Sequence, residues 1–205
     1  MICKYFINIF VLITILFGKF PDAIGYNGMV VSSNQYASDI GIDILKKGGN
    51  AIDAAIGVSF ALAVVHPGAG NIGGGGFMVI RTADGEVTTI DFREKAPSAA
   101  SKDMFLDDSL NVIPGKSWST SLASGVPGSV SGMWLAHQKF GSVNWADIVR
   151  PSVKLAQYGF NLDPLNCSYL NSNYYKSFLS NDIESKNIFT KNEPFKIGEV
   201  FYQTD

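Results

Sequence analysis

Cysteine and histidine are scarce in this 205-residue sequence, which contains two of each. Cys3 precedes the N-terminal apolar run, so a chain cleaved behind that run keeps only Cys167 and can form no internal disulfide. The cysteines and histidines do not have the spacing of zinc ligands, and we expect neither a metal nor another cofactor. Cys167 has no evident catalytic partner, which favours a small, buried residue.

Charge is also sparse. The 16 basic and 18 acidic side chains give a formal net charge of −2 at pH 7. Nucleic-acid binding requires clustered lysine and arginine side chains against the phosphates, and anionic membrane surfaces attract polybasic segments. The sequence has neither pattern, so we expect no nucleic-acid partner and no membrane-surface partner.

The sequence also lacks an N-terminal hydrophobic run of membrane-spanning length. Lys4 precedes an apolar run over residues 5–17, and Ala23-Ile24-Gly25 follows it as a small-x-small exit. This arrangement is typical of a secretory signal peptide, whereas the competing interpretation, a membrane anchor, requires roughly 20 apolar residues. We therefore expect residues 1–25 to be a signal peptide, and the mature chain to be secreted or periplasmic.

Residues 26–205 contain no internal repeat and no linker that would divide them into two domains. The sequence ends at Asp205, after a short apolar run and without a recognisable closing element. We therefore expect a truncated chain that forms part of one domain.

The first part of the mature sequence predicts a strand followed by two helices. Residues 28–33 are rich in strand formers, and the helical spacing of apolar residues from Ala37 predicts an amphipathic helix that ends at Gly48-Gly49. Asn50 and Asp53 have the spacing of a capping box for a second helix. That helix, residues 51–65, is apolar almost all round, so we expect it to be buried.

A β-hairpin and a surface excursion are predicted next. Asp84-Gly85 lies between two β-rich runs, residues 77–82 and 86–91, which is a strong hairpin signal. Residues 96–119 are polar and rich in turn formers, so they predict an excursion on the surface.

Two further helices are predicted after the excursion. Pro127 at a first-turn position predicts the start of a helix that Gly141 ends. Residues 145–158 predict another helix, bent or restarted at Pro151.

Residues 70–76 include a run of consecutive glycines from Gly73 to Gly76. Glycine lets backbone N–H groups approach an anion, yet no Gly-Lys-Ser or Gly-Lys-Thr follows, and the run leads into a strand instead of a helix. Close approach of this backbone to another element is the favoured interpretation, and a pocket lined by backbone is the alternative.

Asp91, Arg93 and Glu94 lie at the exit of the predicted hairpin. The planar guanidinium of Arg93 suits a bidentate grip on a carboxylate. The same arginine could instead be satisfied by Asp91 and Glu94, and the residues alone leave both interpretations open. His66, before Pro67, is more typical of a structural histidine. No serine or cysteine has an evident base, and the sequence has no Gly-x-Ser-x-Gly elbow, so we expect no catalytic residue in this chain.

Five segments together resemble the γ-glutamyltranspeptidase family. They occur in the family's order and with compatible spacing, which a single run of glycines would not establish. The resemblance covers essentially the whole chain from residue 28 onward. The segments are residues 45–55, His66-Pro67, residues 70–78, Asp91-Phe92-Arg93-Glu94 with Ala96-Pro97, and residues 123–128.

The resemblance implies an α+β fold, the four-layer αββα sandwich of N-terminal nucleophile hydrolases, present here only in part. A precursor of this family cuts itself into a large and a small subunit, and residues 26–205 match the N-terminal portion of the large one. The new N-terminal threonine of the small subunit is the nucleophile and, through its amine, the general base. It attacks glutathione or another γ-glutamyl compound, and the γ-glutamyl group passes to water or to amino acids and peptides.

By the same resemblance, Arg93 matches the arginine that grips the α-carboxylate of the glutamyl group, and we assign Asp91 and Glu94 to orienting it. The intact protein is then expected to be a γ-glutamyltransferase and glutathione hydrolase, with the small subunit as partner, and this chain alone is expected to be inactive. The alternatives are a cephalosporin or glutaryl acylase, a capsule-processing transpeptidase on the same scaffold, or an inactive truncated remnant.

Overall fold

The structure is a computed structural model that describes residues 23–203. The predicted signal peptide, residues 1–25, lies outside the described residues apart from residues 23–25. Within residues 23–203, no helix has the length and apolar content needed to cross a membrane.

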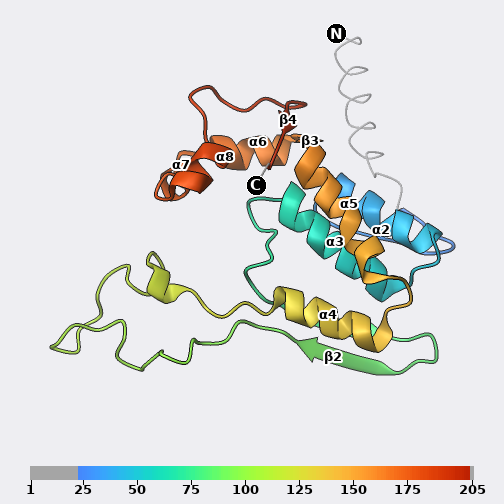
Figure 1. The fold of residues 1–205 in the computed structure, drawn as a ribbon, viewed down its shortest axis with the longest axis horizontal. Coiled ribbons are helices and arrows are strands. Elements are labelled where there is room, and N and C mark those ends of the chain that lie inside the picture. Colours follow the sequence, from blue (N-terminus) through green and yellow to red (C-terminus); the bar gives the residue numbers. More distant parts are fainter. Residues whose placement is uncertain (1–22, 204–205) are drawn as a thin grey trace, which may run out of the picture.

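Three helices pack side by side, with the central one between the other two (Figure 1). They are α2 (Gln35–Lys46), α3 (Ala51–Val65) in the centre, and α5 (Trp145–Tyr158). All three were predicted from apolar spacing and capping residues, and all three are confirmed within one or two residues. Pro151 lies inside α5, which continues past the proline to Tyr158 and ends with Gly159 as its C-cap.

The capping box predicted for α3 is confirmed. The Asn50 side chain accepts the backbone N–H groups of Ile52 and Asp53 at 2.9 and 3.0 Å, and the Asp53 carboxylate accepts the Asn50 N–H at 3.0 Å. Asp53 is fully buried and also accepts the hydroxyl of Ser142, at 2.6 Å, and its backbone N–H, at 3.1 Å to the same oxygen. One carboxylate therefore fixes the start of α3 and the loop that leads into α5.

The predicted hairpin is confirmed as β1 (Phe77–Arg81) and β2 (Val87–Asp91), which pair antiparallel. One of its faces is covered by α4 (Ser129–Phe140), which lies along β2 in Figure 1. Ile80 and Ile90 on that face are buried against α4 residues, whereas Phe77 and Val79 on the other face are 65% and 74% exposed. The alternation along each strand thus separates a packed face from an open one.

Two apolar clusters form the core. The first joins the hairpin and α4 to the start of α3, and the second joins the end of α3 to the C-terminal elements. The first contains Ile44, Ala54, Ile56, Ile80, Ile90, Met133, Ala136 and Ile148. The second contains Ala37, Ala61, Val65, Phe160, Leu162, Cys167, Leu170, Phe195 and Phe201. The central helix α3 contributes to both, which confirms its predicted burial, although Ala51 and Ala55 at one edge are exposed.

The C-terminal part consists of a two-stranded antiparallel pair and three short helices. Cys167 lies in this part and is 8% exposed, which confirms the interpretation of a small, buried residue. Burial, followed by the nearby Asp163 carboxylate, raises the pKa of its thiol. The elements are β3 (Phe160–Asn161), α6 (Pro164–Asn171), α7 (Asn173–Leu179), α8 (Ile183–Phe189) and β4 (Val200–Phe201).

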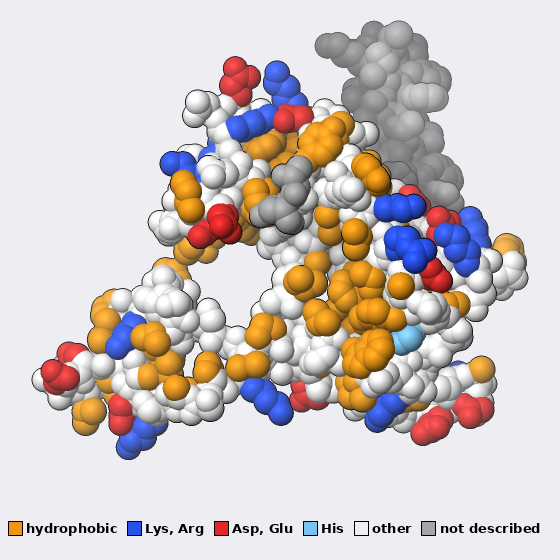
Figure 2. Space-filling model, viewed as in Figure 1, with side chains coloured by type: hydrophobic (Ala, Val, Ile, Leu, Met, Phe, Trp, Pro, Cys, Tyr) orange, Lys and Arg blue, Asp and Glu red, His pale blue; other side chains and the backbone are white. Residues whose placement is uncertain are grey.

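The predicted surface excursion begins at residue 96 and continues to residue 125, beyond its expected end at residue 119, and Val126 then pairs with Lys95. It contains the 3₁₀ helix η1 (Ser121–Ala123). Figure 2 shows it as an arm that extends away from the body of helices. Several of its large apolar side chains are exposed, among them Leu110, Val112 and Trp118.

Two local predictions were wrong. Residues 28–33 are irregular, because within the described residues this segment makes no backbone hydrogen bond to a neighbouring strand, and a strand requires such a partner. Pro127 does not open α4; the helix begins at Ser129, after an N-cap at Gly128. The physical reason lies in the segment before the helix, because Val126 is paired with Lys95 in a β-bridge and the N–H groups of Gly128 and Ser129 donate to the Gly74 carbonyl.

Candidate functional site

The hairpin places the Asp91-Phe92-Arg93-Glu94 segment beside the glycine run. Phe77 pairs with Asp91 as the last register position, and the ladder continues for one more residue. The Phe92 N–H donates to the Gly76 carbonyl at 3.0 Å, and the Gly76 N–H donates to the Phe92 carbonyl at 3.4 Å. Arg93 is therefore the first residue beyond the sheet, and the hydrogen bonds of Phe92 fix the position of the backbone at which it begins.

The Arg93 side chain lies at the surface and is partly fixed by its neighbours. Its Nε donates to Oε2 of Glu94 at 3.1 Å, and its guanidinium carbon lies 5.7 Å from the centre of the Phe77 ring. Its backbone N–H donates to Oδ1 of Asp91 at 3.0 Å. The side chain remains 62% exposed, and within residues 23–203 its two Nη nitrogens make no hydrogen bond. The four N–H donors of these two nitrogens, which lie in one plane, are thus available to a ligand.

Glu94 is ionised at neutral pH. The pKa of its carboxyl lies below the usual value because its own backbone N–H donates to it, and because the Arg93 side chain does so as well. Asp91 contacts the backbone of Arg93 instead of its side chain. Its carboxylate accepts the Arg93 N–H, and among the described residues it makes no ion pair with the guanidinium.

The glycine run packs directly against this segment. A Cβ atom on Gly75 would lie 2.6 Å from the Phe92 carbonyl oxygen and 2.9 Å from the Cα of Arg93. The Gly74 carbonyl accepts the N–H groups of Gly128 and Ser129, at 2.8 and 2.9 Å, at the start of α4. The interpretation of close backbone approach is confirmed, because a side chain at Gly75 would displace Arg93.

Helix α4 closes the other side of Phe92. A Cβ atom on Gly128 would lie 2.0 Å from the Phe92 carbonyl oxygen, and one on Gly132 would lie 2.2 Å from Cγ of the Phe92 ring. Phe92 is therefore held between the glycine run and two glycines spaced four residues apart, which face the same side of the helix. This packing determines where Arg93 leaves the sheet.

A cavity of about 440 Å³ opens beside Arg93. Its charged lining residues are Arg93, Glu94 and Lys95, and the others are mainly small or apolar. Lys95 is held in an extended conformation by two backbone hydrogen bonds with Val126, at 2.8 and 3.2 Å. The remaining lining residues are Ala96, Pro97, Ala100, Met104, Phe105, Leu122, Ala123, Ser124 and Gly125.

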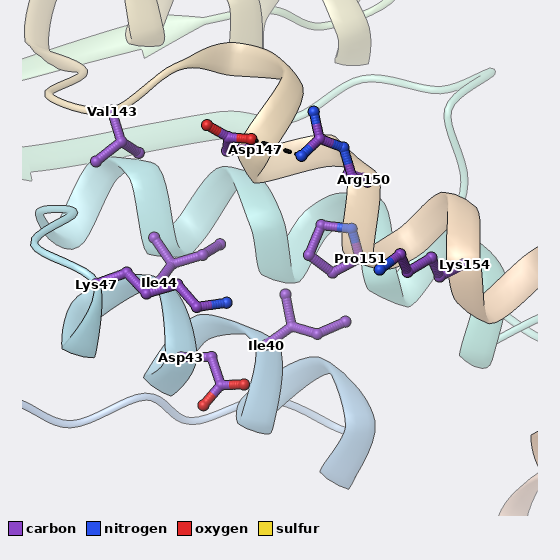
Figure 3. A pocket seen from close by; sticks show the side chains of 9 residues that line it. All are labelled: Ile40, Asp43, Ile44, Lys47, Val143, Asp147, Arg150, Pro151 and Lys154. Carbon is purple, nitrogen blue, oxygen red and sulfur yellow. Dashed lines mark hydrogen bonds and ion pairs between the residues drawn. The ribbon is translucent and has the colours of Figure 1, made fainter.

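A second hollow, also of about 440 Å³, lies between α2 and α5 (Figure 3). Figure 3 shows Ile40, Ile44 and Pro151 on its floor, while Asp147 and Arg150 form an ion pair at its edge, 2.9 Å apart. This hollow contains none of the residues predicted to bind substrate.

His66 lies at the end of the central helix. It follows α3 as its C-cap, and its ring lies 5.8 Å from the ring of Tyr169. Within residues 23–203, no three histidine, cysteine, aspartate or glutamate side chains come together as metal ligands would.

Most of the sequence matches a known protein family. The family model described as gamma-glutamyltranspeptidase matches residues 37–205. This chain belongs to the γ-glutamyltranspeptidase family. It is 49% identical over 179 residues to the glutathione hydrolase proenzyme of Escherichia coli strain K12, a match that covers 87% of this chain and 31% of that protein. The chain thus spans about a third of the length of the curated relatives it matches.

Solved structures agree with the family assignment. The chain resembles the γ-glutamyltranspeptidase of Helicobacter pylori, with 43% identity and a TM-score of 0.83, over 89% of this chain and 52% of that one. It also resembles the transpeptidase enzyme CapD of Bacillus anthracis, with 30% identity and a TM-score of 0.64, over 88% of this chain and 55% of that one. The predicted fold class is confirmed: this family member is α+β and covers part of the N-terminal nucleophile hydrolase fold.

Two residues of the site were missed by sequence reasoning. The hairpin register could have identified Phe77, because counting outward from Asp84-Gly85 places it opposite Asp91. Lys95 lies between Glu94 and Ala96 within the recognised segment, so its place in the chain could have suggested it. The glycine contacts of Phe92 have no comparable local signal, because they depend on how α4 approaches the hairpin.

Proposed function

We propose that this chain is the part of a γ-glutamyltransferase and glutathione hydrolase that binds the α-carboxylate of the γ-glutamyl group. The observation that carries the proposal is the Arg93 guanidinium, which lies at a cavity of about 440 Å³ with both Nη nitrogens unused among the described residues. Membership of a family whose relatives include glutathione hydrolases supports the same reaction.

In this proposal each residue of the motif has one task. The Nη nitrogens of Arg93 donate to the two oxygens of the substrate α-carboxylate. Glu94 holds Nε and so fixes the plane of the guanidinium, while Asp91 fixes the backbone from which the side chain extends. The cavity beyond Arg93 then receives the remainder of the substrate.

The reaction is acyl transfer, and its nucleophile belongs to a part of the protein outside this chain. A threonine hydroxyl oxygen attacks the γ-carbonyl carbon, and its proton passes to the threonine's own amine. The C–N bond breaks, the leaving amine takes that proton, and the γ-glutamyl ester is transferred to water or to an amino acid or peptide. The small subunit that supplies this threonine is the proposed partner.

We also propose that the protein is exported and processed. Residues 1–25 would direct export and be removed, which gives a secreted or periplasmic protein starting at Tyr26, and the precursor would cut itself into two subunits. N-terminal sequencing of both polypeptides from the exported protein tests these two steps, because an N-terminus at Met1 or an uncut precursor would contradict them.

Replacing Arg93 tests the proposed function in the full-length protein that contains this chain. Arg93→Ala removes the hydrogen bonds to the substrate carboxylate, and hydrogen bonds to a charged group contribute about 1.5–3 kcal/mol, so KM for a chromogenic γ-glutamyl anilide should rise at least about tenfold. Arg93→Lys keeps the charge but loses the planar guanidinium, so its KM should lie between those of the unaltered protein and of Arg93→Ala. An unchanged KM in Arg93→Ala would refute the role.

The same assay separates the alternatives. An acylase for substrates without an α-carboxylate would be insensitive to Arg93→Ala. Residues 26–205 by themselves should show no turnover of the anilide, and activity of that isolated chain would place the nucleophile within it.

A further inference from the structure

We propose that Lys95 binds a second carboxylate, that of the peptide leaving group, and thereby favours γ-glutamyl peptides such as glutathione over γ-glutamyl amides without that group. This inference rests on the proposed function of Arg93, and it adds a specificity-determining contact at the other end of the same substrate.

Lys95 and Arg93 are two residues apart, and both line the cavity of about 440 Å³. The two hydrogen bonds between Lys95 and Val126 hold residue 95 in a β-bridge. Successive Cα atoms are about 3.8 Å apart, so the Cα atoms of residues 93 and 95 lie at most about 7 Å from each other. Two cationic residues therefore border the same space.

The charge of Lys95 is not compensated locally. Among residues 23–203, Lys95 takes part in no ion pair, whereas Glu94, the one acidic residue of the cavity lining, already pairs with Arg93. The lining therefore has a net charge of +1, located at Lys95. A substrate with two carboxylates would meet one cation at each end.

Glutathione has the dimensions that this arrangement requires. Ten covalent bonds join its two carboxylate carbons through the γ-glutamyl chain, the cysteine and the glycine, a span of about 12 Å in the fully extended molecule at roughly 3.5 Å per three bonds. The flexible four-carbon stem of lysine extends the backbone separation of about 7 Å to such a span. Apolar residues such as Met104, Leu122 and Ala123 line the same cavity, and they suit the uncharged middle of the peptide.

The effect on binding should be modest, because Lys95 is exposed and an exposed ion pair contributes little. We expect Lys95→Met, which keeps the length of the stem and removes the charge, to raise KM for glutathione about two- to fivefold. The kcat should not change, because Lys95 does not contact the γ-carbonyl carbon in this proposal.

The experiment uses the full-length protein and three donors: glutathione, its glycine monoethyl ester, and a γ-glutamyl anilide. Lys95→Met should raise KM for glutathione alone, because the ester and the anilide have no leaving-group carboxylate. Lys102→Met is the matched control, since Lys102 is an exposed lysine of the neighbouring surface excursion and does not line the cavity. It should leave all three KM values unchanged.

Two results would overturn the inference. One is an equal change in KM, or no change, for all three donors in Lys95→Met. The other needs no variant: the unaltered enzyme should have a lower KM for glutathione than for its monoethyl ester, and equal values would contradict a carboxylate contact. Arg93→Ala should impair all three donors alike, so failure of the proposed function is recognised separately from failure of the Lys95 contact.

Discussion

Replacing Gly132 with alanine is expected to destabilise the protein, although alanine is the better helix former. In an exposed helix interior the exchange stabilises by about 1 kcal/mol. At this position the added Cβ would lie 2.2 and 2.3 Å from Cγ and Cβ of Phe92, far inside van der Waals contact. These two atoms lie next to the backbone, and rotation of the Phe92 ring cannot move them out of contact. The cost of overpacking should therefore reach the upper end of the usual range of about 1–3 kcal/mol. We expect a net loss of about 2 kcal/mol.

The same substitution should impair the site. Relief of the contact requires α4 or Phe92 to move, and Arg93 follows Phe92 directly in the chain. A displacement of about 1 Å at a positioning residue can cost a factor of roughly 100 in activity. We therefore expect a higher KM for γ-glutamyl substrates in the full-length Gly132→Ala protein, in proportion to the displacement of Arg93.

Urea unfolding followed by tryptophan fluorescence measures the free energy of unfolding, since the chain has three tryptophans, one of them Trp134 on α4. Gln138→Ala on the exposed side of α4 is the control and should change stability by a few tenths of a kcal/mol. Phe92→Ala removes the ring that the new methyl group contacts, so Gly132→Ala should cost less in that background. The packing argument is refuted if Gly132→Ala is as stable as the unaltered protein.

Two further predictions concern the buried carboxylate of Asp53 and the exposed carboxylate of Glu94. Asp53→Ala removes a fully buried carboxylate that accepts the Asn50 N–H and the Ser142 hydroxyl. Because Asn50 is half-buried and Ser142 is exposed, water can replace part of these contacts, so the free energy of unfolding should fall by about 2 kcal/mol, as measured by urea unfolding. Ser142→Ala should lower the free energy of unfolding by less, because the backbone N–H of residue 142 still donates to Asp53. An Asp53→Ala protein with an unchanged free energy of unfolding would contradict the role of this carboxylate. For Glu94, the folded pKa lies below the ordinary value of 4.5, so its stabilising effect is present above pH 4.5 and is lost as pH falls through the lower folded value. An NMR titration of the carboxyl carbon should give a midpoint below 4.5 that rises in Arg93→Ala but not to the full value, because the backbone N–H of Glu94 also lowers it.

Local sequence signals predicted those parts of the fold that depend on neighbouring residues. The capping box of Asn50 and Asp53 and the turn at Asp84-Gly85 fix helix and hairpin positions through contacts between residues a few positions apart, and both were found where expected. The strand predicted for residues 28–33 was wrong because strand formation depends on a partner that no local pattern specifies. The helix start predicted at Pro127 was wrong for a similar reason, since the preceding segment pairs with Lys95 and Gly74, which are distant in the sequence.

The sequence left two interpretations of Arg93 open, a contact with a substrate carboxylate or pairing with its own acidic neighbours, and the two are compatible in the structure. A guanidinium has five N–H donors in one plane, and Glu94 uses the Nε side of that plane only. An arginine satisfied completely by its neighbours would have no donor left for a substrate, whereas an unpaired arginine would sample many orientations and lose more entropy on binding. Pairing on one edge leaves the Nη nitrogens available and restricts where they point. On this argument Glu94→Gln should weaken substrate binding less than Arg93→Ala, because it removes the restriction and keeps the donors.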